Sequence, residues 1–175
     1  DHPRRRVALM FFFWTHVGAV ILLLGLLAIG LNVGSFDFAD INEAAIPADI
    51  LIAAAVAIII GLGVKLAAFG FHIWLPYAHG SAPTPISALL SPAMIGIGAY
   101  ALFRLIVEFL PQTYADLSIW ISIWGVATMF YGGAMALMQD DIKRVFAYSS
   151  ISQMGYLLFG IGSMSTLGLA GAEMM

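Results

Sequence analysis

The sequence has 175 residues, of which 62% are hydrophobic and 10% are charged, and its formal net charge is −3. A soluble domain keeps about a quarter of its residues charged, so this composition excludes an ordinary water-soluble domain and predicts a membrane protein. The basic residues are too scattered for a nucleic-acid surface. The lack of cysteine excludes iron–sulfur ligation and thiolate zinc sites within this sequence.

Five segments are apolar enough, over the roughly 20 residues that a bilayer requires, to cross it as helices. In chain order they are residues 7–31, 50–75, 86–110, 117–138 and 145–163. The runs lack the period-two alternation of strands. The sequence therefore predicts an all-α fold, a polytopic transmembrane helix bundle of about five spans that forms a single membrane domain over residues 1–175. Since it has no initiator Met and stops at "GAEMM", we expect it to be part of a longer protein.

The charges between the predicted spans indicate an orientation. Arg4, Arg5 and Arg6 precede the first span, and Lys143 and Arg144 lie between the fourth and the fifth, whereas residues 32–49 hold acidic residues and no Lys or Arg. Cytoplasmic loops are enriched in Lys and Arg. We therefore expect the N-terminus of this chain to be cytoplasmic.

Lys65 lies deep inside the second predicted span. About 15 helical residues at ~1.5 Å each would carry it well into the hydrocarbon layer, where an ammonium facing lipid costs at least about 2.5–3.5 kcal/mol. We expect Lys65 to face other helices or a hydrated cavity and to act as a proton relay; a snorkelling lysine or a structural ion pair is the alternative. The flanking Gly61, Gly63 and Gly70 allow either close helix packing or a broken helix, and we expect the break near Lys65.

Three histidines are candidate members of the same proton relay. His72 and His79 follow Lys65 in the run "FHIWLPYAH", and His16 lies in the first span. Histidine titrates near pH 6.5, so each can carry a proton; the alternative is an ordinary hydrogen bond to a neighbouring group. Two histidines are too few for a zinc site, and we expect no metal.

Four charged residues are better explained as structural polar groups. Arg104 and Glu108 are four residues apart on one helix face and can form an ion pair. Asp141 and Lys143 lie in the turn before the fifth span, where the helix dipole favours an acidic residue.

Two stretches, "VKLAAFGFHIWLPYAHGSAPTPISALL" and "QDDIKRVFAYSSISQMGY", resemble the proton-translocating, antiporter-like membrane subunits. That family includes the large pumping subunits of respiratory complex I, Mrp-type sodium/proton antiporter subunits, and relatives in membrane-bound hydrogenases and formate hydrogenlyase. The resemblance implies a larger bundle with two inverted five-helix repeats, of which this chain would cover helices six to ten.

The resemblance also places individual residues. It puts Lys65 on the family's lysine in the broken seventh helix, and His72 and His79 on histidines of some members. The partner glutamate of the fifth helix would lie upstream of this chain. The eighth-helix lysine or histidine has no counterpart, since Ser91 and Gly96 stand at the candidate positions.

The expected function is translocation of H⁺ or Na⁺ by a subunit of a redox-driven complex, such as a membrane-bound hydrogenase or an NADH:quinone oxidoreductase, in the cell membrane of a prokaryote. Other membrane subunits and the lipid bilayer are its expected partners. The alternatives are a non-conducting structural anchor of such a complex and an Mrp-type antiporter subunit. The sequence has no cofactor motif, so we expect no cofactor and no redox chemistry in this chain itself.

Overall fold

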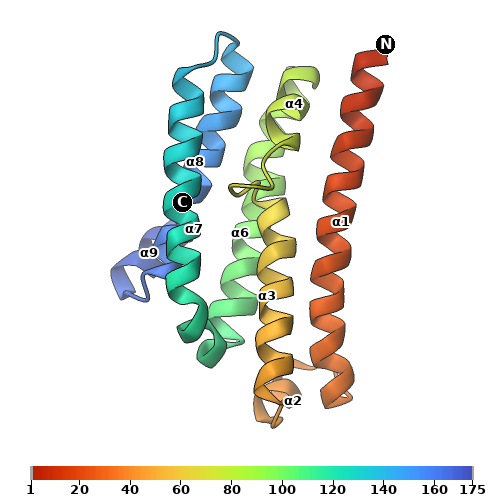
Figure 1. Ribbon diagram of the computed structural model, residues 1–175, viewed down its shortest axis with the longest axis vertical. Coiled ribbons are helices and arrows are strands. Elements are labelled where there is room, and N and C mark those ends of the chain that lie inside the picture. Colours follow the sequence, from red (N-terminus) through yellow and green to blue (C-terminus); the bar gives the residue numbers. More distant parts are fainter. Residues whose placement is uncertain (1, 175) are drawn as a thin grey trace.

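The computed structural model describes residues 2–174, and the side chains of residues 4–41 and 44–174. Its described part is helical and has no strand (Figure 1), which confirms the predicted all-α class. In chain order the elements are α1 (His2–Val33), α2 (Phe38–Glu43), α3 (Ala48–Lys65), α4 (Trp74–Ser81), α5 (Thr84–Leu89), the π-helical η1 (Leu90–Ile95), α6 (Gly96–Leu102), the π-helical η2 (Phe103–Glu108), α7 (Pro111–Leu137), α8 (Ile142–Gly162) and α9 (Thr166–Met174).

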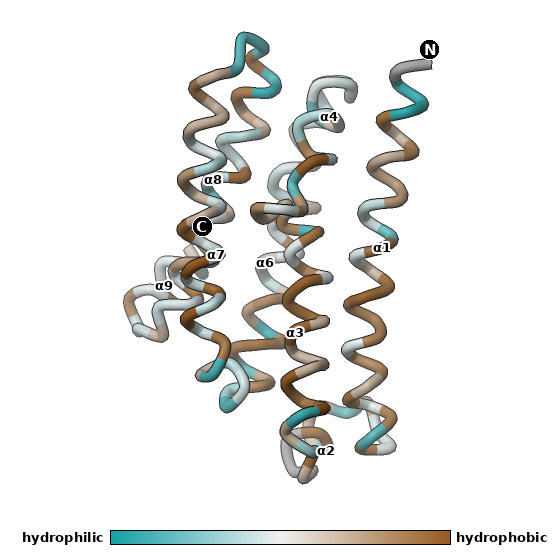
Figure 2. Tube along the Cα trace, viewed as in Figure 1, coloured by the Kyte–Doolittle hydropathy of each residue, from teal (hydrophilic) through white to brown (hydrophobic). Residues whose placement is uncertain are grey.

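Four helical stretches of the described chain are long and apolar enough to span a bilayer: Arg4–Val33, Ala48–Lys65, Thr84–Glu108 and Pro111–Leu137. They correspond to the first four predicted spans. The fifth predicted segment forms α8, a helix of 21 residues that is more polar because serines and basic residues occupy its first turns. Figure 2 shows apolar residues along the long helices and hydrophilic ones gathered at their ends.

Two helix pairs form the body of the bundle, α1 beside α3 and α7 beside α8 (Figure 1). Small residues let the partners approach closely: a Cβ placed on Gly61 of α3 would lie 2.6 Å from the carbonyl oxygen of Gly18 in α1. A Cβ on Gly155 of α8 would meet the backbone of Met129 in α7 in the same way. Close packing, one of the two roles expected for the glycines near Lys65, therefore accounts for Gly61.

The third long helix changes its hydrogen-bonding pattern along its length. It begins as α5, passes through the π-helical turn η1, continues as α6 and ends in the π-helical turn η2. Pro92 lies inside η1 and has no backbone N–H to donate. A π-helical turn is one way in which a helix continues past such a residue.

Candidate functional site

The helix that carries Lys65 is broken immediately after it, as expected. α3 ends at Lys65, and the chain does not become α-helical again until Trp74. Between them Ala67 and Gly70 adopt positive φ angles of 53° and 92°. Gly70 reaches its angle without the Cβ clash that other residues meet there. The second predicted span, 50–75, is thus two helices, α3 and α4, joined by an irregular segment.

Lys65 is partly buried and borders an open groove. Its aliphatic stem lies over Gly98 of α6, where an added Cβ would be 3.4 Å from Lys65 Cβ. The groove has a volume of about 440 Å³, and every other residue that lines it is apolar: Ile86, Leu89, Leu90, Ala93, Met94 and Ile97. Among the side chains that the structure describes, the sole ion pair joins Arg104 to Glu108, so no described carboxylate neutralises the Lys65 ammonium.

Side-chain hydrogen bonds hold the irregular segment in place. The indole Nε1 of Trp74, which is completely buried, donates to the carbonyl oxygen of Val64 at 3.0 Å. From α7, Thr128 Oγ1 accepts from the backbone N–H of Phe69 at 3.0 Å, and Trp124 Nε1 donates to the carbonyl oxygen of Phe69 at 2.8 Å. Sequence reasoning missed all three side chains, because a Trp or Thr inside an apolar run is common and gives no local signal.

His72 and His79 are both buried, with 8% and 4% of their surfaces exposed. His79 Nδ1 lies 2.6 Å from Ser87 Oγ, and the His72 ring lies 4.5 Å from the ring of Tyr131 in α7. His72 Nδ1 and His79 Nε2 are buried without a hydrogen-bond partner in the described part of the chain. Each histidine therefore has one buried ring nitrogen without a described partner.

His16 lies apart from these groups, on an exposed part of α1. Its Nδ1 is 2.8 Å from the carbonyl oxygen of Phe12, and its ring lies 3.8 Å from the Phe12 ring. Its hydrogen bond is thus within its own helix and does not reach a neighbouring one.

The four residues predicted to be structural polar groups make the following contacts. Arg104 and Glu108 form an ion pair on the outer side of η2. Asp141 caps α8 by accepting from the backbone N–H of Lys143 at 2.9 Å. The same lysine contributes a contact that the sequence did not indicate, because its Nζ donates to the carbonyl oxygen of Ala82 at 3.0 Å and links α8 to the end of α4.

A hydroxyl pair connects the π-helical turn η1 with α8. Ser91 Oγ and Ser150 Oγ are 2.8 Å apart, and Ser150 also donates to the carbonyl oxygen of Phe146 at 3.0 Å. Ser87, the partner of His79, lies four residues before Ser91 and thus on the same helix face. Polar groups therefore follow one side of α5 and η1, while Lys65 borders the apolar residues of an adjacent side.

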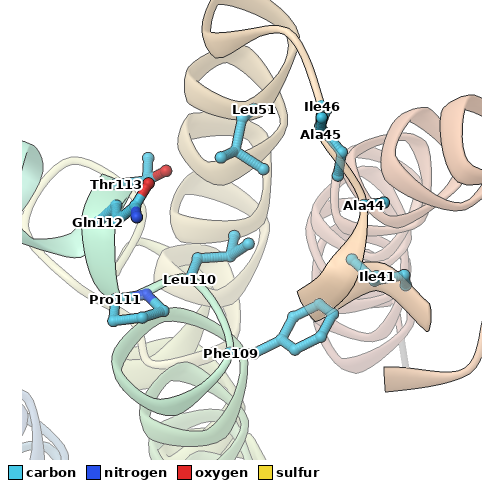
Figure 3. Close-up of a pocket in the computed structure, with 10 residues that line it drawn as sticks. All are labelled: Ile41, Ala44, Ala45, Ile46, Leu51, Phe109, Leu110, Pro111, Gln112 and Thr113. Atoms are coloured by element: carbon cyan, nitrogen blue, oxygen red, sulfur yellow. The ribbon is translucent and has the colours of Figure 1, made fainter. Parts of the chain in front are cut away.

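A separate cavity of about 290 Å³ lies at the opposite end of α3 from Lys65 (Figure 3). It is enclosed by the segment between α2 and α3 and by the start of α7, and its lining residues are Ile41, Ala44, Ala45, Ile46, Leu51, Phe109, Leu110, Pro111, Gln112 and Thr113. None of these residues carries a titratable side chain, so we assign the cavity no part in the site around Lys65. The described residues also contain no group of His, Cys, Asp and Glu that could hold a metal ion.

Comparisons with known proteins agree with this architecture. The family described as "NADH:quinone oxidoreductase/Mrp antiporter, TM" matches residues 2–175. A curated relative, the NAD(P)H-quinone oxidoreductase chain 4-2 of Synechocystis sp. (strain ATCC 27184 / PCC 6803 / Kazusa), is 36% identical over 171 residues, which are 97% of this chain and 31% of the relative.

Two solved structures share the fold. The chain matches the archaeal membrane-bound sulfane sulfur reductase with a TM-score of 0.85 and 25% identity, over 93% of this chain and 34% of that one. It matches the Mrp complex of Dietzia sp. DQ12-45-1b with a TM-score of 0.88 and 23% identity, over 95% of this chain and 31% of that one. The chain thus spans about a third of the length of its relatives.

The family match covers almost the whole chain, and the apolar helices and the broken helix at Lys65 are consistent with it. The chain is a multi-pass membrane protein and belongs to the NADH:quinone oxidoreductase/Mrp antiporter transmembrane family.

Proposed function

We propose that this chain is part of an ion-translocating subunit of a multi-subunit membrane complex, and that Lys65 is its central proton carrier. The observation that carries the proposal is the position of the Lys65 ammonium at the free C-terminal end of a broken helix, beside an open groove and without a described carboxylate partner. A charge is expensive at membrane depth, and an amine held there without a permanent counter-ion can exchange its proton.

Two features surround this amine. The Lys65 carbonyl has no described donor at the end of α3, since Leu66, Ala67 and Ala68 donate to the carbonyls of Leu62, Val64 and Gly63. The groove has an apolar lining, which includes Leu90 and Met94, and so gives the amine no polar partner. A segment from outside the described chain that brings a carboxylate into this groove would pair with the amine, and its withdrawal would leave the amine able to exchange its proton.

His72 and His79 are the candidates for exchanging protons between Lys65 and the end of the bundle where α4 meets α8. Both are buried and keep a ring nitrogen without a described partner, which suits them to pass protons through water molecules. His16 is a weaker candidate because it is exposed and bonded within α1. We assign the Arg104–Glu108 pair, Asp141 and Lys143 to structure rather than to transport.

The proposed setting is a redox-driven complex in a prokaryotic cell membrane, with this part of the chain beginning in the cytoplasm. The name of the curated relative denotes a quinone oxidoreductase chain, and the solved relatives are an archaeal respiratory complex and an Mrp complex. These names support other membrane subunits as partners. The proposed translocated ion is H⁺ or Na⁺. Redox chemistry would belong to other subunits.

The test is to replace Lys65 by Ala in the full complex, in sealed membrane vesicles, and to follow proton movement with a pH-sensitive dye and sodium movement with a radioactive tracer. We expect transport per redox turnover to fall by about tenfold or more, the scale at which removal of a positioned acid–base group is felt. Arg6→Ala, a change in an exposed basic residue of α1, is the control for effects of lost charge alone. Unchanged transport by the Lys65→Ala complex would refute the role of Lys65.

A non-conducting structural anchor is the second candidate function. The observation in its favour is that Ser91 and Gly96, rather than a basic residue, occupy the stretch from η1 to the start of α6. Under this alternative, Lys65→Ala would lower the yield of assembled complex at most, and each assembled complex would transport ions as the parent does.

A further inference from the structure

We propose that Thr128 of α7, assisted by Trp124, is a positioning residue that keeps α3 open at Lys65. The inference rests on the proposed role of Lys65 and extends it. It names the side chains that hold the irregular segment directly after Lys65. Thr128 lies 59 residues from Phe69 in the sequence and is completely buried.

The argument begins with one backbone N–H group. In an uninterrupted α-helix, the N–H of Phe69 would donate to the carbonyl oxygen of Lys65, four residues earlier. It donates instead to Thr128 Oγ1, at 3.0 Å. The chain has already left the helix at Ala67, which has φ 53° and donates, as Ala68 does, to a carbonyl of the last turn of α3. The hydroxyl of Thr128 accepts the next N–H that a continuing helix would have used, and so holds the chain in its open path after Lys65.

The donors and acceptors around Thr128 are consistent with this role. Its hydroxyl hydrogen is donated to the carbonyl oxygen of Trp124, 2.7 Å away, so a lone pair on the same oxygen remains to accept from Phe69. The indole Nε1 of Trp124 donates to the carbonyl oxygen of Phe69 at 2.8 Å. One peptide of the irregular segment is therefore held through both its N–H and its C=O by neighbouring turns of α7.

Trp124 also sets the position of the last turn of α3. Its ring lies directly over Gly63, so closely that a Cβ on Gly63 would overlap the ring. Gly63, in contrast to Gly61, therefore has its small size explained by contact with α7. Trp124 thus contacts the chain on both sides of Lys65: its ring packs on Gly63, and its indole N–H donates to Phe69.

The consequence concerns the electrostatics of the Lys65 amine. The carbonyls of Leu62, Gly63 and Val64 accept from the N–H groups of Leu66, Ala68 and Ala67, which leaves the Lys65 carbonyl without a described donor. An unpaired carbonyl at a helix C-terminus carries partial negative charge that stabilises a nearby cation. If the N–H of Phe69 returned to the Lys65 carbonyl, or if the segment became disordered, that charge would be moved away from the amine. Thr128 and Trp124 would thereby influence how readily Lys65 holds its proton, without touching the amine.

The test measures the reactivity of Lys65 in the complete, detergent-solubilised complex, with an amine-acylating reagent and mass spectrometry at a fixed pH. Thr128→Val removes the hydroxyl while keeping the side-chain shape. We expect the acylation rate of Lys65 to rise about two- to fivefold, in line with loss of a helix-end interaction. Thr128→Ser keeps the hydroxyl and should react as the parent does. Thr113→Val, a change in another buried threonine of α7, is the matched control and should leave the rate unchanged.

A Thr128→Val complex whose Lys65 is acylated at the parent rate would overturn the inference. If that variant does not assemble, Trp124→Phe is the second test, because it keeps an aromatic ring but removes the indole N–H. The proposal requires Trp124→Phe to raise the acylation rate of Lys65. Trp120→Phe, a change in an exposed residue of α7, is the control and should leave that rate unchanged. Acylation is measured without ion transport. The predicted change in acylation rate can therefore fail while Lys65→Ala still abolishes transport. The role of Thr128 and the role of Lys65 are thus tested separately.

Discussion

The ammonium of Lys143, at the start of α8, donates to the carbonyl oxygen of Ala82, at the end of α4, across 3.0 Å. Next to it, the guanidinium of Arg144 lies 5.8 Å from the ring centroid of Tyr77 in α4. These two contacts connect the α7–α8 pair to the short helix that follows the break after Lys65. The basic turn before α8 is therefore part of the framework of the site.

Replacing Lys143 by Met should loosen this connection. The Ala82 carbonyl would lose a charged donor in a partly buried position, and we expect the complete protein to lose about 1–2 kcal/mol of stability. Thermal unfolding of the purified complex measures the loss. Lys143→Arg keeps a donor at the same place and should recover most of it; an equal loss in both variants would show that the hydrogen bond is not responsible.

The orientation predicted from the basic residues can be tested by cysteine labelling, which is convenient because this sequence has no cysteine. Ala45 and Asp140 are both exposed, in the segments before α3 and before α8. With a cytoplasmic N-terminus, Asp140→Cys should react with a membrane-impermeant thiol reagent only in inverted vesicles, and Ala45→Cys only in intact cells. The opposite labelling pattern would reverse the assigned topology.

Gly70 and Gly96 form a matched pair for testing the backbone of the break. A Cβ on either residue would meet open space, but Gly70 has φ +92° whereas Gly96 has the helical value of −60°. We expect Gly70→Ala to destabilise the protein by about 1–2 kcal/mol. Gly96→Ala should be neutral or stabilising by up to about 1 kcal/mol.

The melting temperatures of the two glycine variants provide the measurement. A Gly70→Ala protein that melts at or above the temperature of the Gly96→Ala protein would contradict the left-handed conformation at Gly70. Because neither substitution creates a contact, a difference between them reports on backbone conformation alone.

Trp74→Phe should be costly although it keeps an aromatic ring. The buried indole N–H donates to the Val64 carbonyl at the end of α3. Without it that carbonyl still accepts from the backbone N–H of Ala67 at 3.3 Å, so the loss is that of one buried hydrogen bond, about 0.5–1.5 kcal/mol. Trp120→Phe, in a residue that is 66% exposed, should stay within about 0.5 kcal/mol of the parent. Chemical unfolding of the reconstituted protein, followed by fluorescence, compares the two; similar losses would mean that the Val64 hydrogen bond has no net value.

The long helices could be predicted because their information is local. The apolar runs of α1 and α7 are far longer than a strand or a loop would tolerate, and the break in the second span is signalled by a lysine and three glycines within ten residues. The role of Trp74 could not be predicted: it is completely buried and donates to Val64, and nothing local in the run "FHIWLPYAH" indicates that acceptor. Composition shows that an indole is amphipathic, and it does not show where the hydrogen-bond acceptor lies.

The site was predictable at Lys65 and not at the residues that hold it. A charge inside an apolar run is conspicuous, whereas Trp124 and Thr128 reach the break across 55 and 59 residues of sequence, and such contacts depend on how α7 packs beside α3. The short helix α2 was missed too, because its six residues are half polar and too few to show a helical period.

The π-helical turn η1 makes the spacing between residues on either side of it functionally important. Such a turn accommodates one residue more than an α-helix would, so Ser87 before it and Gly98 after it face directions that a regular helix could not give them. Deleting a single residue within η1 would turn one half of the helix by about 100° relative to the other. The face that carries the partner of His79 would then no longer be in register with the face that lies under the Lys65 stem. Length, as much as composition, is constrained in this stretch of the chain.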